Sequence, residues 1–325
     1  MKNKFIVYGI LSVLSFVGCD KEDDLSWNGE RTNWFEIQDK PGRFNQLAYQ
    51  VYRESGLPIF VNDTIGTEVR GTDAYGEPII HHEMFVVGYS ITSQLGEAGF
   101  VLSSDTANML KAVELIRDRV IPNLPAKLLY RPYSIFLVDT LYSIDYDWKA
   151  DPKSWPDNMQ TAYSYRSMMG VVAGRLFEIS RMNEDEQAFW AGMIVAENVA
   201  PALMEHYNDD IQDFYKVTKD AGGDYRTMYR GFASTGAPID PNFSKECEEL
   251  GFFEWKNVGK YKPAPTLFLQ KTTISDALDV KEYVAAVYAY TQQKFEELYA
   301  DYPFCIKKYK IMKGIVERFK QEIDK

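Results

Sequence analysis

Histidine and cysteine are scarce in this chain, with three of each among 325 residues. No CxxC pair and no Cys/His cluster is present, which excludes a zinc site built from thiolates. The sequence also lacks a GxSxG elbow, a GxGxxG segment and a GxxxxGK[ST] loop. The common signatures of serine hydrolases, dinucleotide-binding proteins and P-loop proteins are therefore absent.

Long apolar runs and positive charge are also limited. After residue 18, no stretch approaches the roughly 20 apolar residues that a membrane-spanning helix needs. The formal net charge is −11. A surface this acidic repels nucleic acid and anionic headgroups, so neither is expected as a partner. The apolar content of 46% is ample for a folded core.

The N-terminus has the layout of a secretory signal. Lys2 and Lys4 precede an uncharged, mostly apolar run from Phe5 to Gly18, and Cys19 follows. A short basic segment, a short apolar segment and a small residue before the cleavage site are typical of signal peptides. The end of this run resembles a bacterial lipoprotein signal, in which the cysteine becomes the lipidated first residue.

The acidic tract 20–24 resembles the surface-export signal of Bacteroidetes lipoproteins. We therefore expect a signal peptide over 1–18, lipidation of Cys19, an acidic tether over 19–40 and a single domain over 41–325. The protein would then be attached to the outer membrane and exposed at the cell surface. An ordinary signal peptide, in which Cys19 has no role, is the alternative.

Residues 41–325 have the pattern of an α+β domain. Apolar spacing predicts helices over 43–54, 108–122, 164–182, 188–207, 214–229, 280–299 and 306–323. Apolar and β-branched runs predict strands over 59–61, 83–92 and 133–138, and 66–78 is expected to be a loop or hairpin. Because strands and helices come first and helices alone follow, we expect a small mixed sheet in the N-terminal half and a predominantly helical C-terminal half.

The histidines offer little for catalysis. His81 and His82 are adjacent, so on a strand they point to opposite faces. The segment from His82 to Phe85 begins like a zinc HExxH helix, but Val86 stands where the second histidine is needed and the local pattern is that of a strand. His206 lies near a predicted helix end, where a basic residue suits the helix dipole.

Other polar and aromatic residues leave alternatives open. Asp145, Asp147 and Asp151 could bind Ca²⁺ weakly, but they lack the Gly and Glu of an EF-hand, and a solvated loop is the simpler interpretation. Cys247 and Cys305 are compatible with one disulfide or with two buried thiols. Tryptophans in loop-like segments could pack at loop bases, stack on sugar rings or fill a partner interface, namely Trp27, Trp34, Trp148 and Trp155.

Several segments occur in an order that resembles a known family. They are the helix 108–122 leading into the strand 134–138, Gly251-Phe252, Asp279-Val280-Lys281-Glu282, and Tyr302-Pro303 with the terminal helix. Over roughly residues 40–325 the chain resembles the substrate-import-associated zinc metallopeptidase lipoproteins of Bacteroidetes, which accompany outer-membrane nutrient-import systems. The resemblance implies a zincin-like fold, with HExxH on a central helix and a DxxE-type segment further along.

In this chain the motif is degenerate. The resemblance matches DxxE to Asp279 and Glu282 and places the motif helix over 169–182, where the motif position reads Gly174-Arg175-Leu176-Phe177-Glu178. Both imidazoles are missing, and Arg175 replaces the general base. Because a catalytic zinc needs three protein ligands, we expect no metal, no cofactor and no catalytic residue here. An ion pair of Arg175 with Glu178 or Glu282 is expected instead.

The sequence therefore favours a catalytically inactive metallopeptidase-like lipoprotein that binds a ligand or assists a nutrient-import system. The alternative is an active hydrolase, a peptidase or glycosidase, that uses carboxylates around Glu178 and Glu282. A third hypothesis is a structural subunit whose old cleft has collapsed. The expected partners are the membrane, through the lipid on Cys19, and proteins of an import complex. Peptide, glycan and protein all remain open as ligands.

Overall fold

The computed structural model describes residues 32–88, 98–143, 161–226, 228–230, 245–257 and 271–323. The chain divides into Met1–Asn33 and a compact unit, Trp34–Lys325. This unit includes the end of the expected tether, because the ring of Phe35 packs edge-on against that of Phe60 with 5.6 Å between centroids. The predictions for Cys19, Trp27, Trp148, Trp155 and the three loop aspartates fall outside the described residues.

A four-stranded mixed sheet has the strand order β1-β5-β8-β7. β1 (Ile59–Phe60), β5 (Ile135–Leu137) and β8 (Gly170–Ala173) are parallel, and β7 (Ser164–Ser167) pairs antiparallel with β8 at the edge. Ile135 and Leu137 pack in one core with α3 and α5, whereas Phe136 packs in a second core. A strand buried on both faces reads as an uninterrupted apolar run, which is how the sequence predicts β5.

The helices of the N-terminal half agree with the predictions. α2 (Arg43–Ser55) ends at Gly56, which adopts the left-handed conformation with φ 72°. α3 (Thr106–Leu115) begins at Asp105, whose carboxylate accepts the backbone N–H groups of Ala107 and Asn108 at 2.8 and 3.1 Å. A π-helical segment, Ile116–Val120, and a 3₁₀ turn, Ile121–Asn123, continue α3.

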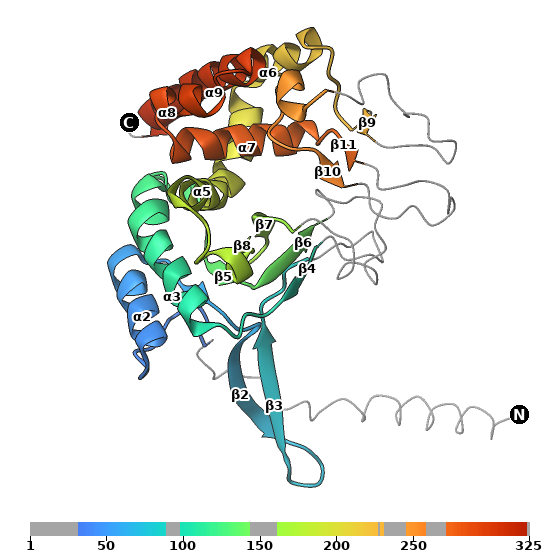
Figure 1. Ribbon diagram of the computed structural model, residues 1–325. Helices are drawn as coiled ribbons and strands as arrows, with labels where there is room; N and C mark the ends of the chain where they lie inside the picture. The colour runs from blue at the N-terminus through green and yellow to red at the C-terminus, as the bar shows by residue number, and fades with distance from the viewer. Residues whose placement is uncertain are drawn as a thin grey trace, which may run out of the picture. The chain divides into compact units, whose positions relative to one another are not determined.

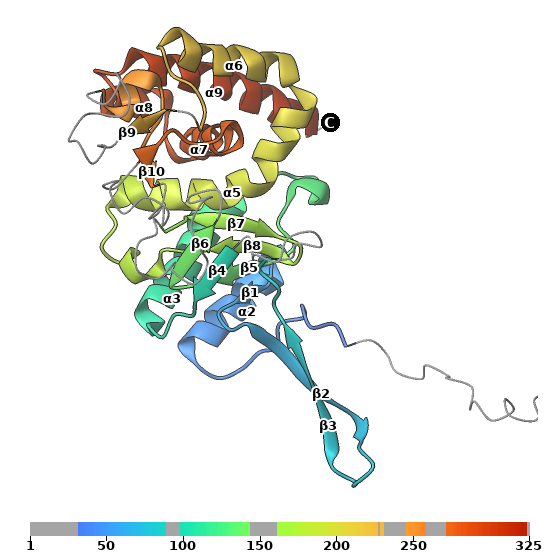
Figure 2. The ribbon, with the colours of Figure 1, turned by 90° about the vertical axis from the view of Figure 1, so that its right-hand side faces the viewer.

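Three smaller sheets are described. β2 (Thr64–Thr72) pairs with β3 (Pro78–Met84), β4 (Ala98–Val101) pairs with β6 (Thr140–Ser143), and β11 (Lys271–Thr272) lies between β10 (Lys256–Asn257) and β9 (Tyr229–Arg230). The β2–β3 hairpin projects from the rest of the compact unit (Figures 1 and 2).

The predicted strand over 83–92 is placed too late in the chain. β3 starts at Pro78 and ends at Met84, because the next residue, Phe85, leaves the hairpin and enters the core. The backbone N–H of Phe85 donates to the carbonyl of Asp63 at 2.6 Å, and its ring lies 4.7 Å from that of Phe136. Part of the predicted strand, 89–92, falls outside the described residues.

The predicted helix over 164–182 is wrong, because this segment forms the β7–β8 hairpin. The chain turns at Gly170, whose φ of 148° favours glycine. A Cβ at this position would lie 2.2 Å from the carbonyl oxygen of Ser134, so no larger residue fits. The apolar residues that mimic helical spacing are thus divided between the hairpin and one 3₁₀ turn, Leu176–Glu178.

The C-terminal half is mostly helical, which completes the α+β architecture. Its helices are α5 (Glu184–His206), α6 (Asn208–Asp220), α7 (Asp276–Ala289), α8 (Gln292–Leu298) and α9 (Pro303–Ile323). α5 lies between the main sheet and the other C-terminal helices (Figures 1 and 2). None of the helices in the described part of the chain combines the length and apolar character needed to cross a membrane.

The predicted C-terminal helices are confirmed in part. The helices over 188–207 and 306–323 correspond to α5 and α9. The helix predicted over 280–299 is two helices, because Tyr290 is extended and the hydroxyl of Thr291 caps α8 by accepting the backbone N–H of Lys294 at 3.2 Å. The helix predicted over 214–229 is α6, which begins and ends earlier in the chain.

α5 and α7 approach closely at Gly192. A Cβ on Gly192 would lie 2.3 Å from the carbonyl oxygen of Ala285, so backbone must move to admit it. We therefore expect Gly192→Ala to lower the free energy of unfolding by about 1–3 kcal/mol through overpacking. Gly314→Ala in α9 is the control, because a Cβ there meets nothing within 4 Å. Its expected effect, measured by urea denaturation, is a gain of about 0.5–1 kcal/mol from helix propensity.

Candidate functional site

The predicted motif position does not lie on a helix. Gly174 follows β8, Arg175 has a left-handed backbone with φ 65°, and Leu176–Glu178 is a single 3₁₀ turn. The ion pair expected between Arg175 and Glu178 is present, and the Arg175 guanidinium carbon lies 4.0 Å from the ring centroid of Tyr163. The alternative pairing of Arg175 with Glu282 is not found, because Glu282 instead contacts Lys256.

Asp279 and Glu282 lie one turn apart on α7, and both are buried. They do not share a site, because each meets its own lysine. The side chain of Asp279 pairs with Lys308 of α9. Glu282 pairs with Lys256 of β10, with 2.9 Å between Nζ and Oε1, and Lys256 also pairs with Glu254.

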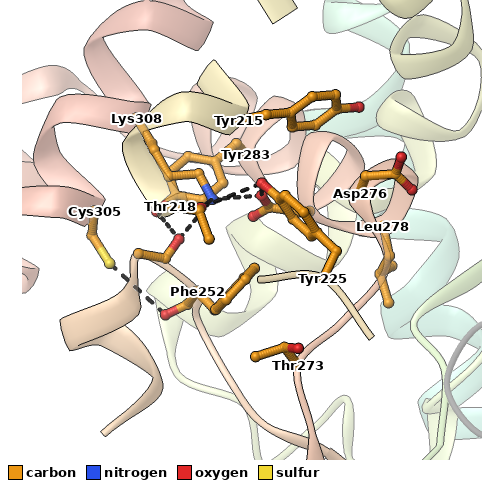
Figure 3. Close-up of polar contacts among 12 residues, drawn as sticks. Tyr215, Thr218, Tyr225, Phe252, Thr273, Asp276, Leu278, Tyr283, Cys305 and Lys308 are labelled. Carbon is orange, nitrogen blue, oxygen red and sulfur yellow. Dashed lines mark hydrogen bonds and ion pairs between the residues drawn. The ribbon is translucent and has the colours of Figure 1, made fainter. Parts of the chain in front are cut away.

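The Asp279–Lys308 pair is enclosed by aromatic rings, and its polar contacts are drawn in Figure 3. Lys308 Nζ donates to Asp279 Oδ2 at 2.5 Å, to the carbonyl oxygen of Gly251 at 2.8 Å and to Thr218 Oγ1 at 3.0 Å. The Tyr225 hydroxyl also donates to Asp279 Oδ2, at 2.7 Å. The same ammonium lies 4.4–4.9 Å from three ring centroids, those of Phe214, Tyr283 and Phe252.

Burial opposes the ionised form of this pair. It raises the pKa of Asp279 and lowers the pKa of Lys308, and their mutual attraction and hydrogen bonds act against both shifts. Asp279 Oδ1 has no hydrogen-bond partner among the described residues. The pair therefore has the features of a buried structural ion pair that joins α7 to α9.

A third buried carboxylate, Glu197 of α5, did not figure among the residues predicted from the sequence. Its Oε1 accepts hydrogen bonds from Lys281 Nζ at 2.7 Å and from Ser164 Oγ at 2.6 Å. Glu197 stands within Ala196-Glu197-Asn198-Val199-Ala200, which has the spacing of HExxH with alanine at both histidine positions. A single acidic residue inside the apolar run of a long helix is the signal that could have located it.

Zinc does not fit the residues present around Glu197. HExxH supplies two imidazoles one turn apart on one helical face, whereas Ala196 and Ala200 carry no donor. Glu197 is neutralised by the Lys281 ammonium, which would repel a cation. Within the described residues, no three His, Cys, Asp or Glu side chains are grouped so that they could hold a metal ion.

The structure also describes the remaining histidines and cysteines singled out from the sequence. His82 Nδ1 lies 3.1 Å from Thr67 Oγ1, and His81 Nε2 lies 3.0 Å from Glu83 Oε2, both on the β2–β3 hairpin. His206 is the last residue of α5. Cys247 and Cys305 are both buried and form no disulfide, so the alternative of two buried thiols is the correct one.

Two adjoining pockets open beside the first turns of α5. The larger, which we name the arginine pocket, has a volume of about 330 Å³ and is lined by Arg175, Arg181, Glu178 and Met182. The smaller, which we name the acidic aromatic pocket, has a volume of about 210 Å³ and is lined by Phe189, Phe253, Tyr290, Tyr299, Glu254 and Glu282. Tyr163 and Glu186 line both pockets.

Glu282 reaches the acidic aromatic pocket from α7. Its Oε1 contacts Lys256, whereas its Oε2 is buried and has no hydrogen-bond partner among the described residues. Burial raises the pKa of Glu282 to about 7, and Lys256 acts in the opposite direction. The pocket therefore holds one acid that changes its protonation state near neutral pH.

Comparisons with protein-family models, with curated proteins and with solved structures found no match for this chain.

Proposed function

We propose that this protein is a surface lipoprotein, anchored through Cys19, whose zincin-like domain is a catalytically inactive relative of zinc metallopeptidases. In this proposal the domain serves as a binding or accessory component of an outer-membrane nutrient-import system. The observation that carries the proposal is the central helix α5, where alanines occupy both histidine positions of an HExxH-spaced segment and Glu197 is retained.

The order of the elements supports a zincin-like fold. A small mixed sheet is followed by a long helix with the HExxH spacing, and then by α7 with Asp279 and Glu282 in the DxxE positions. Placing the motif on α5 replaces the earlier assignment to 174–178. The two assignments differ in position but agree that the imidazoles of a zinc site are missing.

The lysine contacts support loss of catalysis. Each of the three buried carboxylates described above, Glu197, Glu282 and Asp279, has a buried ammonium against it. Two of these pairs join α5 to α7 and α7 to α9, and the third joins α7 to β10. A metal site would instead need negative charge that no lysine compensates. A fold whose buried carboxylates are paired with lysines suits a protein that binds its ligand rather than cleaves it.

Zinc content tests this proposal. We expect the detergent-solubilised full chain, exposed to Zn²⁺ and then desalted, to retain far less than one zinc per chain by elemental analysis. We also expect it to leave a mixture of unstructured peptides uncleaved. One zinc per chain, or peptide hydrolysis that a chelator abolishes, would contradict the proposal.

The alternative, a hydrolase that uses carboxylates, has one observation in its favour. Glu282 has a pKa of about 7 and lines a pocket, which suits a general acid or base. This alternative predicts hydrolysis that survives chelation and is lost in Glu282→Gln. Peptide and glycoside substrates tested side by side distinguish it from an inactive domain.

A further inference from the structure

The acidic aromatic pocket combines three features that together define a ligand: aromatic walls, carboxylates and a buried acceptor without a partner. We propose that it binds the side chain of a basic amino acid, free or within a peptide, with the ammonium or guanidinium group against Glu282. This inference names a ligand class for the binding role proposed above. It depends on that proposal in one respect, namely that the domain binds its ligand without cleaving it.

The walls are a continuous set of half-buried rings. Phe189 contacts Tyr163 and Phe253, with ring centroids 5.4 and 6.1 Å apart, and lies parallel to Tyr290 at 6.4 Å. Phe253 in turn contacts Tyr299 at 5.2 Å. Rings from α5, from the residues that directly follow α7 and α8, and from two loops thus face one small space. Aromatic faces attract cations as well as apolar methylene groups.

The charge at the pocket is negative. Three carboxylates line it, those of Glu186, Glu254 and Glu282, and no basic side chain is among the described residues of its lining. Lys256 touches two of these carboxylates, but its own side chain is 2% exposed and lies behind them. The net charge of the chain is also negative, so the surface as a whole attracts cations.

Glu282 Oε2 indicates where the cation would sit. A buried carboxylate oxygen without a donor costs free energy, and a ligand ammonium or guanidinium supplies the missing hydrogen bond. Both donors match a carboxylate well, and guanidinium does so in a bidentate manner. No other polar atom of this pocket is both buried and unpartnered within the described part of the chain.

The volume of the pocket further limits which ligands fit. A volume of about 210 Å³ is below the usual range of about 300–1,000 Å³ for small-molecule sites, and suits one long side chain better than a sugar chain. The arginine pocket adjoins it at Tyr163 and Glu186. Arg181, which is exposed there, would face the carboxylate of a free amino acid or the next residues of a peptide.

The test is calorimetric titration of the detergent-solubilised full chain. The probes are L-lysine, L-arginine, the peptides Ala-Lys-Ala and Ala-norleucine-Ala, and maltose. We expect lysine or arginine, free or in the peptide, to bind at least tenfold more tightly than the norleucine peptide and maltose. Binding of both peptides with equal affinity, preference for maltose, or no binding at all would overturn the inference. The free amino acid and the peptide together show which source of the basic side chain is preferred.

Two variants tie the binding to this pocket. Glu282→Gln keeps the shape of the side chain and its contact with Lys256, and it is expected to weaken binding at least tenfold. Glu297→Gln is the matched control. Glu297 lies on the exposed side of α8, so this change should leave the affinity unchanged. Phe189→Leu keeps an apolar wall but removes a ring, so about a tenfold loss is expected. Unchanged affinity in Glu282→Gln would by itself overturn the inference, whatever the effect of Phe189→Leu.

The two proposals fail in different ways. If Ala-Lys-Ala is bound and then hydrolysed, the pocket inference stands and the inactive-domain proposal falls. If nothing basic is bound, no peptide is cleaved and no zinc is retained, the pocket inference falls and the inactive domain stands.

Discussion

Replacement of Lys308 by methionine is expected to lower the free energy of unfolding by about 3–5 kcal/mol, because Asp279 would remain buried without its cation. Lys308 is fully buried, and Asp279 would keep only the hydroxyl of Tyr225 as a donor. Methionine keeps most of the apolar stem, so little of the loss would come from packing. Urea denaturation at neutral pH measures the effect.

A double variant separates the lost charge from the lost contacts. In Lys308→Met/Asp279→Leu both charges are gone, and the loss should be much smaller than in Lys308→Met, because apolar replacement of a buried pair is often neutral. The carbonyl of Gly251 would keep the hydroxyl of Tyr283 as a donor, and Tyr225 would keep Thr218. Lys307→Met, the exposed neighbour on α9, should change stability by less than about 0.5 kcal/mol. Equal losses in the single and double variants would show that the buried charge is not what matters.

Local sequence patterns predicted those elements whose own residues determine them. The end of α2 follows from Gly56, the start of α3 from the capping carboxylate of Asp105, and β5 from a run that is apolar because both faces are buried. These signals act over a few residues. The same is true of the Arg175–Glu178 pair, whose i,i+3 spacing brings the two side chains together without a regular helix.

The β7–β8 hairpin was missed because its apolar residues happen to have helical spacing. Met168, Val172, Leu176 and Ile179 repeat every three or four residues, and short apolar runs do not distinguish strand from helix. The turn is set by Gly170 and by the close approach of Ser134, which is far away in the chain. The hydroxyl of Ser134 donates to the carbonyl of Met169 across 35 positions. Residue spacing within the segment does not contain this information.

The buried ion pairs could not be predicted for a related reason. Lys281 meets Glu197 across 84 positions and Lys308 meets Asp279 across 29. The sequence shows the lysines as ordinary charged residues of amphipathic helices, which are usually solvated. The spacing of residues 196–200 gives no signal in the sequence either, because Ala196 and Ala200 are ordinary residues of an apolar helix. Only the fold identifies Glu197 as buried and paired.

Between about pH 4.5 and 7, the stability of the wild-type protein relative to Glu282→Gln is expected to fall as the pH rises. Burial raises the pKa of Glu282 from 4.5 to about 7 in the folded protein. A carboxyl group with a raised folded pKa contributes stability that is fully present below its unfolded pKa and is lost as the pH passes its folded pKa. The expected change in the difference between the two proteins is on the order of 3 kcal/mol. Urea denaturation of both at pH 4.5, 6 and 8 measures it.

The comparison with Glu282→Gln is needed because other groups titrate in opposite directions. A hydrogen bond from Arg117 lowers the pKa of Asp118, so the contribution of Asp118 to stability is lost as the pH falls. The pKa of Asp279, in contrast, is raised like that of Glu282. The contribution of Asp118, which is not among the groups that act on Glu282, is common to both proteins and cancels in the difference. The groups that act on Glu282 are Lys256, which favours its ionisation, and Glu254 and Asp279, which oppose it. A difference that stays nearly constant from pH 4.5 to 8 would mean that Lys256 outweighs burial and keeps Glu282 ionised throughout this range, and the pocket would then offer a cation a permanent charge rather than one that depends on pH.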